Sequence, residues 1–132
     1  MFHSKRRPFR VLVADDDENI RDLVELNFMM EGYEVLTAAN GYEAEVIVRR
    51  EQPDVVILDI MMPGRDGLAV LRSMRADPAT HDIPVVLLTA KATNGEVLDG
   101  WRAGAAGYTT KPFDPGDLIR YVSSLLNQEQ RV

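Results

Sequence analysis

Residues 10–17, RVLVADDD, and residues 55–59, VVILD, decide how this chain folds. Each is a short run of mostly β-branched apolar residues that leads into aspartate, and such a run predicts a buried strand of a parallel sheet. The acids should therefore stand at the carboxyl ends of two strands, where open α/β sheets bind ligands. Carboxylates gathered there repel one another unless a hard cation lies between them, and oxygen ligands of this kind suit Mg²⁺.

Strand and helix patterns alternate along the whole chain. Strands are expected at Arg10–Ala14, Glu34–Ala38, Val55–Asp59, Val85–Thr89 and around Gly107–Thr110. Helices are expected at about Glu18–Met30, Gly41–Glu51, Leu68–Ala76, Asn94–Arg102 and Asp114–Asn127, the last with Asp114 as its cap. Strict alternation with long crossovers predicts a doubly wound, five-stranded parallel sheet with five helices on its two faces.

The composition is that of one compact, soluble domain. A chain of 132 residues with 45% hydrophobic residues can bury a single sizeable core. It contains no cysteine, which excludes disulfides and thiolate metal sites. No apolar stretch is long enough to cross a bilayer and the start lacks a secretory signal, so we expect a cytoplasmic location. The net charge of −6 disfavours nucleic-acid binding by the domain.

The two ends of the chain are interpreted as tails around this domain. The first end is locally basic, with Lys5, Arg6, Arg7 and Arg10. A solvated tail is the simpler interpretation of such a cluster, ahead of a functional contact. We divide the chain into a basic N-terminal tail at 1–8, a domain at 9–127 and a C-terminal tail at 128–132.

Four segments, taken in order, resemble a known family. They are VLVADDD at 11–17, DVVILDIMMPGRDGLAVL at 54–71, PVVLLTA at 84–90 and GAAGYTTKPF at 104–113. Together they resemble the receiver domain of bacterial two-component response regulators, over about Phe9 to Leu126. Asp59 to Gly67 fits that family's D-x-x-M-P-x-x-D-G pattern, and Lys111 to Phe113 fits its K-P-F pattern. The resemblance implies a flavodoxin-like, chemotaxis-type fold with strand order 2-1-3-4-5.

The resemblance also implies a phosphorylation site. Asp59 would be the phosphoacceptor, taking a phosphoryl group from the phosphohistidine of a sensor histidine kinase or a histidine phosphotransfer protein. Asp15, Asp16, Asp59 and the backbone carbonyl of Met61 would hold Mg²⁺. Phosphoryl transfer of this kind depends on positioning and charge neutralisation rather than on a strong protein base.

Three further positions take their roles from the same resemblance. Lys111 and Thr89 would contact the phosphoryl group. Thr89 and Tyr108 would form a switch that changes the face made by the fourth helix, the fifth strand and the fifth helix, so that a downstream protein, which we do not identify, binds there. The peptide bond before Pro112 is typically cis in this family.

The resemblance describes a signalling phosphoacceptor rather than an enzyme acting on other substrates. It would catalyse its own phosphorylation and its slow dephosphorylation, with Met61 and Lys91 at positions that tune hydrolysis. We expect no direct contact with nucleic acid or membrane, and a monomer or a phosphorylation-dependent dimer. The ion-paired dimer of winged-helix relatives is not expected, because Ala106 and Gly107 replace its acidic pair.

Two other functions stay open. An Mg²⁺-dependent phosphatase of the haloacid-dehalogenase type would need a second acid two residues after the nucleophile, where Met61 stands. A phosphorylation-independent scaffold would be expected to have lost the acids or the lysine that this chain retains. Outside these motifs, Trp101 is expected to pack in the core at the end of the fourth helix.

Overall fold

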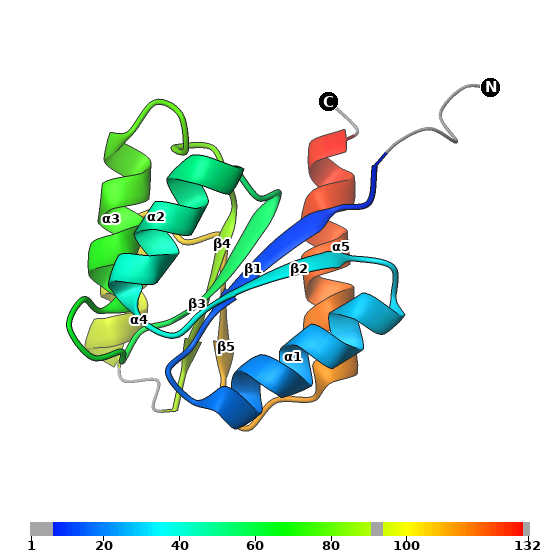
Figure 1. Ribbon diagram of the computed structural model, residues 1–132. Coiled ribbons are helices and arrows are strands. Elements are labelled where there is room, and N and C mark those ends of the chain that lie inside the picture. Colours follow the sequence, from blue (N-terminus) through cyan, green and yellow to red (C-terminus); the bar gives the residue numbers. More distant parts are fainter. Residues whose placement is uncertain (1–6, 91–93, 131–132) are drawn as a thin grey trace.

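A computed structural model of the chain places five parallel strands between two layers of helices (Figure 1). It describes residues 7–90 and 94–130. The strands are β1 Arg10–Ala14, β2 Glu34–Ala38, β3 Val55–Asp59, β4 Val85–Thr89 and β5 Gly107–Thr110. They lie in the order β2-β1-β3-β4-β5, and every neighbouring pair is parallel. Both the predicted fold class and the strand order are confirmed.

The helices agree with the predicted ranges except at the start of the third helix and at both ends of the fifth, which begins at Pro115 rather than Asp114. They are α1 Glu18–Met30, α2 Gly41–Glu51, α3 Gly67–Ala76, α4 Asn94–Arg102 and α5 Pro115–Gln130. Helix α3 begins one residue earlier than predicted because Asp66 caps it, accepting a 2.8 Å hydrogen bond from the backbone N–H of Ala69. Helix α5 continues three residues beyond its predicted end.

The sheet separates two hydrophobic cores. Alternate residues of β1 and β3 point to opposite faces, as the period of a strand requires. One core lies under α1 and α5 and contains Val11, Val13, Val55 and Ile57. The other lies under α2 and α3 and contains Leu12, Ala14, Val56 and Leu58. These eight side chains are fully buried, so the central strands are held rigidly from both sides.

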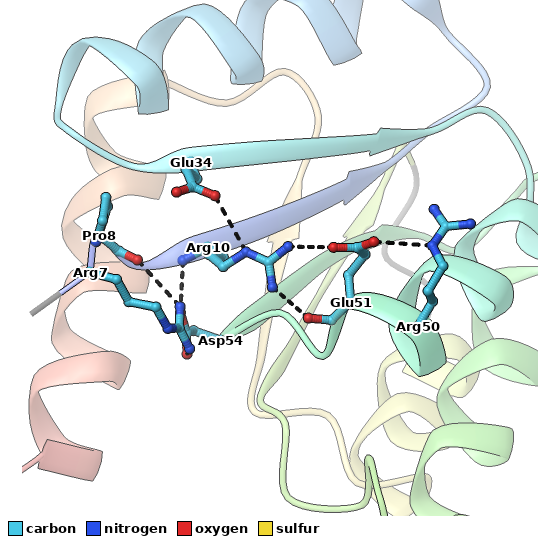
Figure 2. Close-up of polar contacts among 7 residues, drawn as sticks. All are labelled: Arg7, Pro8, Arg10, Glu34, Arg50, Glu51 and Asp54. Carbon is cyan, nitrogen blue, oxygen red and sulfur yellow. Dashed lines mark hydrogen bonds and ion pairs between the residues drawn. The ribbon is translucent and has the colours of Figure 1, made fainter.

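The amino end of the sheet is fastened by ion pairs (Figure 2). The Arg10 side chain, only 18% exposed, pairs with Glu51 at 2.7 Å and with Glu34 at 3.4 Å. The backbone N–H of Arg10 donates to Asp54 at 2.7 Å, and Arg7 pairs with the same carboxylate at 3.2 Å. Arg10 is therefore a structural residue, contrary to the interpretation of the basic cluster as solvated.

Two members of that cluster, Lys5 and Arg6, lie outside the described residues.

The expectation that Trp101 packs in the core is wrong, since its side chain is 47% exposed. The buried side of α4 passes instead through its neighbour Gly100. A Cβ atom added to Gly100 would come within 2.7 Å of the Leu87 side chain and 3.3 Å of the Tyr108 ring. Because α4 approaches the sheet this closely at Gly100, the next residue is turned toward the surface.

Candidate functional site

Four strand ends meet at the carboxyl edge of the sheet. Asp15 follows β1, Asp59 ends β3, Thr89 ends β4 and Lys111 follows β5. Strand register brings these residues into neighbouring positions, because Leu58 lies beside Ala14, Leu88 beside Asp59 and Thr110 beside Thr89. The backbone N–H of Lys111 also donates to the Thr89 carbonyl at 2.7 Å.

Lys111 is the cation at the centre of this group. Its Nζ atom lies 2.8 Å from Oδ2 of Asp15 and 3.3 Å from Oδ2 of Asp59. The peptide bond between Lys111 and Pro112 is cis. Burial alone would lower the pKa of Lys111, but the hydrogen bond to Asp15 and the charges of Asp59 and Asp15 outweigh burial, so the pKa is raised. Lys111 therefore remains a cation at neutral pH.

Three carboxylates lie close together at these strand ends. Asp15 is fully buried, Asp59 is 3% exposed and Asp16 is open to solvent. One oxygen from each of the three lies within 4.8 Å of the others. Asp15 is fixed through its other oxygen, Oδ1, which accepts the backbone N–H of Asp17 at 2.9 Å. Asp15 and Asp59 are thus held close together with little access to water.

Burial and the neighbouring negative charge of Asp15 shift the pKa of Asp59. Desolvation first, and then the negative charge of Asp15, raise the pKa of Asp59 to about 6. Lys111 and the backbone N–H of Met61, which donates to Asp59 Oδ1 at 3.3 Å, offset this only in part. The contacts that the protein makes with Asp59 therefore do not fully offset the cost of ionising this carboxyl group at the end of β3.

The loop between β3 and α3 places the exposed Met61 side chain beside the buried Asp59. Ile60 continues the sheet by donating its N–H to Leu88 O at 3.0 Å, and the Met61 side chain then turns to solvent. The chain returns against β3 at Gly67, where an added Cβ would come within 2.2 Å of the Asp59 carbonyl oxygen. Glycine is required at this close approach, which allows α3 to start directly beside the site.

The donor set fits a hard divalent cation. Among the residues that the structure describes, the three carboxylates of the cluster exceed the Lys111 ammonium by two negative charges when all are ionised. All the candidate ligands are oxygens, and their separation allows a single ion to contact all three. These residues are therefore consistent with a magnesium site.

Comparison with known proteins decides what kind of domain this is. Residues 11–123 match the response regulator receiver domain model. This chain belongs to the response regulator receiver family. The receiver fold, the two-component assignment and the acidic cluster at the strand ends thus agree with one another.

The known relatives of this chain come from several kinds of protein. The chain is 40% identical over 123 residues to the DNA-binding dual master transcriptional regulator RpaA of Synechocystis sp.. The aligned region covers 93% of this chain and 51% of that protein. The receiver therefore spans about half the length of this curated relative. Two solved structures are similar over nearly their whole length.

One solved structure is the chemotaxis protein CheY4 of Vibrio cholerae, with a TM-score of 0.84, 32% identity, and 89% of this chain and 98% of that chain covered. The other is the signal receiver domain of a histidine kinase from Syntrophus aciditrophicus, with a TM-score of 0.86, 29% identity and 94% of each chain covered. Relatives thus include a chemotaxis protein, a domain of a kinase and part of a DNA-binding regulator.

The two residues expected to form the receiver's switch lie on one face of the sheet. Thr89 is buried at the end of β4 and pairs in register with Thr110. Tyr108 pairs with Leu87, two residues earlier in both strands. Because side chains two residues apart share a face, Thr89 and Tyr108 are diagonal neighbours. The Tyr108 ring also packs toward Gly100 of α4, so it connects the site to that helix.

Of the two residues expected to tune hydrolysis, the structure describes only one. Lys91 lies outside the described residues, whereas Met61 has an exposed side chain beside the site. Sequence reasoning missed Arg21, whose Nη1 donates to the Asp15 carbonyl oxygen at 2.8 Å. No local motif marks that arginine, because its role depends on how α1 folds back beside the end of β1.

Within residues 7–90 and 94–130, none of the helices is both long enough and apolar enough to cross a membrane.

Proposed function

We propose that Asp59 is the phosphoacceptor of this receiver and takes a phosphoryl group from a phosphohistidine on a sensor histidine kinase or a histidine phosphotransfer protein. The observation that carries this proposal is the Lys111 ammonium, which contacts both buried carboxylates at 2.8 and 3.3 Å. An ammonium in that position can contact a phosphoryl oxygen and the acceptor carboxylate together.

The transfer needs no protein base. A carboxylate oxygen of Asp59 attacks phosphorus while the bond between phosphorus and the donor's imidazole nitrogen breaks. The electron pair of that bond returns to the imidazole, and the product on this chain is an acyl phosphate. Lys111 stabilises charge on the phosphoryl oxygens, and the Thr89 hydroxyl donates to one of them.

Asp15, Asp16, Asp59 and the backbone carbonyl of Met61 would hold Mg²⁺ beside the acceptor. Bound there, the cation supplies positive charge that neutralises the phosphoryl oxygens. Asp15 would act largely through metal-bound water, with its side chain oriented by the hydrogen bond from the Asp17 N–H and by Lys111. Hydrolysis of the acyl phosphate would be slow and tuned by Met61 and Lys91.

Phosphorylation would change the shape of the face made by α4, β5 and α5. A groove of about 490 Å³ lies on this face, between β5 and α5. Tyr108 lines the groove and packs toward α4, so a change at Thr89 that moves the Tyr108 ring would change the groove's shape. We propose that a downstream protein binds there in a phosphorylation-dependent way, without direct contact of the receiver with nucleic acid or membrane.

The receiver is proposed to occupy residues 9–127, flanked by tails at 1–8 and 128–132, and to act in the cytoplasm. A phosphatase of the aspartyl-nucleophile type is not favoured. Such an enzyme needs a second acid two residues after its nucleophile, and that position holds the exposed Met61 side chain.

Incubation with acetyl phosphate, with and without Mg²⁺, tests the proposal by intact mass. Wild type should gain one phosphoryl group only with Mg²⁺, and Asp59→Asn should gain none. Asp66→Asn is the matched control, because it makes the same chemical change at an exposed aspartate that caps α3, and asparagine caps helices equally well. An adduct on Asp59→Asn, or none on folded wild type with several phosphoryl donors, would contradict the assignment.

A further inference from the structure

Helix α2 has an apolar stripe on its outward side. The Tyr42 side chain is 61% exposed and the Val46 side chain 49% exposed. With Glu43, Ile47 and Arg50 they line a shallow cavity of about 370 Å³ formed by this helix alone. Single exposed apolar residues are ordinary on protein surfaces, so the stripe requires a second observation before it implies a partner.

That second observation is the placing of charge around the stripe. Glu43 and Arg50 are seven residues apart, which is nearly two turns, so they lie on the same side of α2 about 10 Å apart along its axis. The midpoint between them falls between Val46 and Ile47. If a second α2 lies antiparallel about a two-fold axis at that midpoint, each Glu43 faces the Arg50 of the other copy. The stripe is therefore complementary to itself in both charge and apolar character.

We propose that a second copy of this chain docks on α2, forming an antiparallel helix pair with Val46 and Ile47 at the two-fold axis. Charge complementarity favours this occupant, because each Glu43 meets an Arg50 in the antiparallel pair and no like charges of the residues that line the stripe face one another. An isologous contact of this kind closes into a dimer and does not continue into a filament.

The charged groups are available for such a contact. Arg50 uses its Nε atom to pair with Glu51 at 3.1 Å, while its side chain stays 64% exposed (Figure 2). Glu43 uses Oε1 to accept the backbone N–H of Ala39 at 2.8 Å at the start of α2. That contact holds the carboxylate in place, and its charge remains at the exposed surface. Both charged groups therefore lie at the exposed surface of α2.

The aromatic end of the stripe is also held by the fold. The Tyr42 ring lies over Gly64, where an added Cβ would come within 3.0 Å of its Cε2 atom. A ring already packed on one side loses little conformational freedom when its other side is covered. Tyr42 can therefore serve as a rigid contact at each end of the pair.

The pair leaves the proposed output face open. Helix α2 packs beside α3 and β2, on the opposite side of the sheet from α1 and α5 (Figure 1). The groove at β5 and α5 is lined by none of the stripe residues. One dimer could therefore present two output faces at once.

Sedimentation equilibrium of the unphosphorylated protein tests the proposal. A contact of one helix per copy is small, so we expect association that becomes measurable only at about 100 μM or above. Arg50→Glu should weaken it about tenfold, because two opposite-charge contacts become two like-charge contacts. Combining Arg50→Glu with Glu43→Arg should restore it. Arg102→Glu, the same charge change on α4, should leave it unchanged.

Cysteine crosslinking provides a second measurement that does not depend on charge. The chain has no cysteine, so Val46→Cys introduces a single thiol. Under mild oxidation it should form a disulfide dimer about ten times faster than Leu26→Cys, an exposed position on α1. Circular dichroism melts would verify that each variant is folded, since Glu43→Arg also removes the contact with Ala39.

Three outcomes would overturn the proposal. The first is a monomer at every concentration with equal crosslinking at the two cysteine positions. The second is a dimer that Arg102→Glu weakens and Arg50→Glu does not, which would place the contact on α4. The third is a dimer weakened by Arg50→Glu that the folded double variant fails to restore.

Discussion

The charged side chains are arranged differently at the two ends of the sheet. At the amino end, Arg10 faces Glu51 and Glu34, so cation and carboxylates lie next to one another near the surface (Figure 2). At the carboxyl end, Asp15 and Asp59 are buried together and both contact Lys111. At the carboxyl end, burial and the charge of Asp15 raise the pKa of Asp59 to about 6, whereas at the amino end the hydrogen bonds from Arg10 and Arg50 lower the pKa of Glu51.

This difference separates structure from function within one sheet. The amino-end charges stabilise the fold because each has a partner in the protein. The carboxyl-end charges destabilise it because part of their compensation must come from a bound cation or from a phosphoryl group's contacts. Removing a charge should therefore have opposite effects at the two ends, unless the charge removed is that of Lys111, which contacts both buried acids.

The largest expected effect is that of Lys111→Met. This change leaves two buried carboxylates without their ammonium, and we expect the free energy of unfolding to fall by about 3 kcal/mol at pH 7. Chemical denaturation without Mg²⁺ measures it. Adding Mg²⁺ should recover part of the loss, because a cation again lies among the acids. A loss that Mg²⁺ does not change would mean that Lys111 acts through packing alone.

Arg10→Met should cost less, about 2 kcal/mol, and should not respond to Mg²⁺. The change removes the ion pair with Glu51 and the 2.5 Å hydrogen bond to the Glu51 carbonyl, but the remaining carboxylates are partly exposed. Denaturation in parallel with Lys111→Met compares the two ends directly. Arg72→Met, on the exposed side of α3, is the control and should be nearly neutral. Recovery of Arg10→Met with Mg²⁺ would contradict the separation of the two ends.

Asp59→Asn should have the opposite sign. The raised pKa of Asp59 means that the folded state binds more protons than the unfolded state between about pH 4 and pH 6, so wild-type stability falls as pH rises through that range. Asparagine removes this penalty, and we expect a gain of about 1 to 2 kcal/mol at pH 7 without Mg²⁺. Melting curves at pH 7 and pH 4.5 measure the gain, which should shrink at the lower pH. A gain independent of pH would have another cause.

Sequence patterns predicted the parts of this molecule that depend on local periodicity. The strand ranges, the order of elements and the meeting of Asp15 and Asp59 all follow from apolar runs that end in aspartate, and all are observed. The ends of helices were harder. The start of α3 depends on the Asp66 side chain capping it, and a capping aspartate resembles any other loop acid in the sequence.

Contacts between distant elements could not be predicted in this way. Trp101 was expected inside because an apolar residue at a helix end usually packs on the sheet, yet the close approach at Gly100 turns it outward. Arg10 belongs to a basic stretch, and its partners Glu34 and Glu51 come from other elements. Such roles depend on which segments the fold brings together.

The smallest expected effect is the stabilisation of the folded state by Mg²⁺ at the carboxyl end of the sheet. A ligand that binds only the folded state stabilises it by about 1 kcal/mol at about five times its dissociation constant. Mg²⁺ should therefore raise the melting temperature of wild type by a few degrees. Asp16→Asn, which changes an exposed acid of the cluster, should lose most of this increment with little effect on the fold.

Arg10→Met is the control for this small stabilisation by Mg²⁺. Its side chain lies at the other end of a five-residue strand, about 16 Å away, where independent changes normally add. It should therefore keep the full Mg²⁺ increment on top of its lower stability. Equal increments in Asp16→Asn and wild type would mean that Mg²⁺ acts elsewhere on this acidic protein. Loss of the increment in Arg10→Met would mean that the two ends of the sheet are coupled, and that the division between a charge-balanced structural end and a charge-unbalanced functional end does not hold.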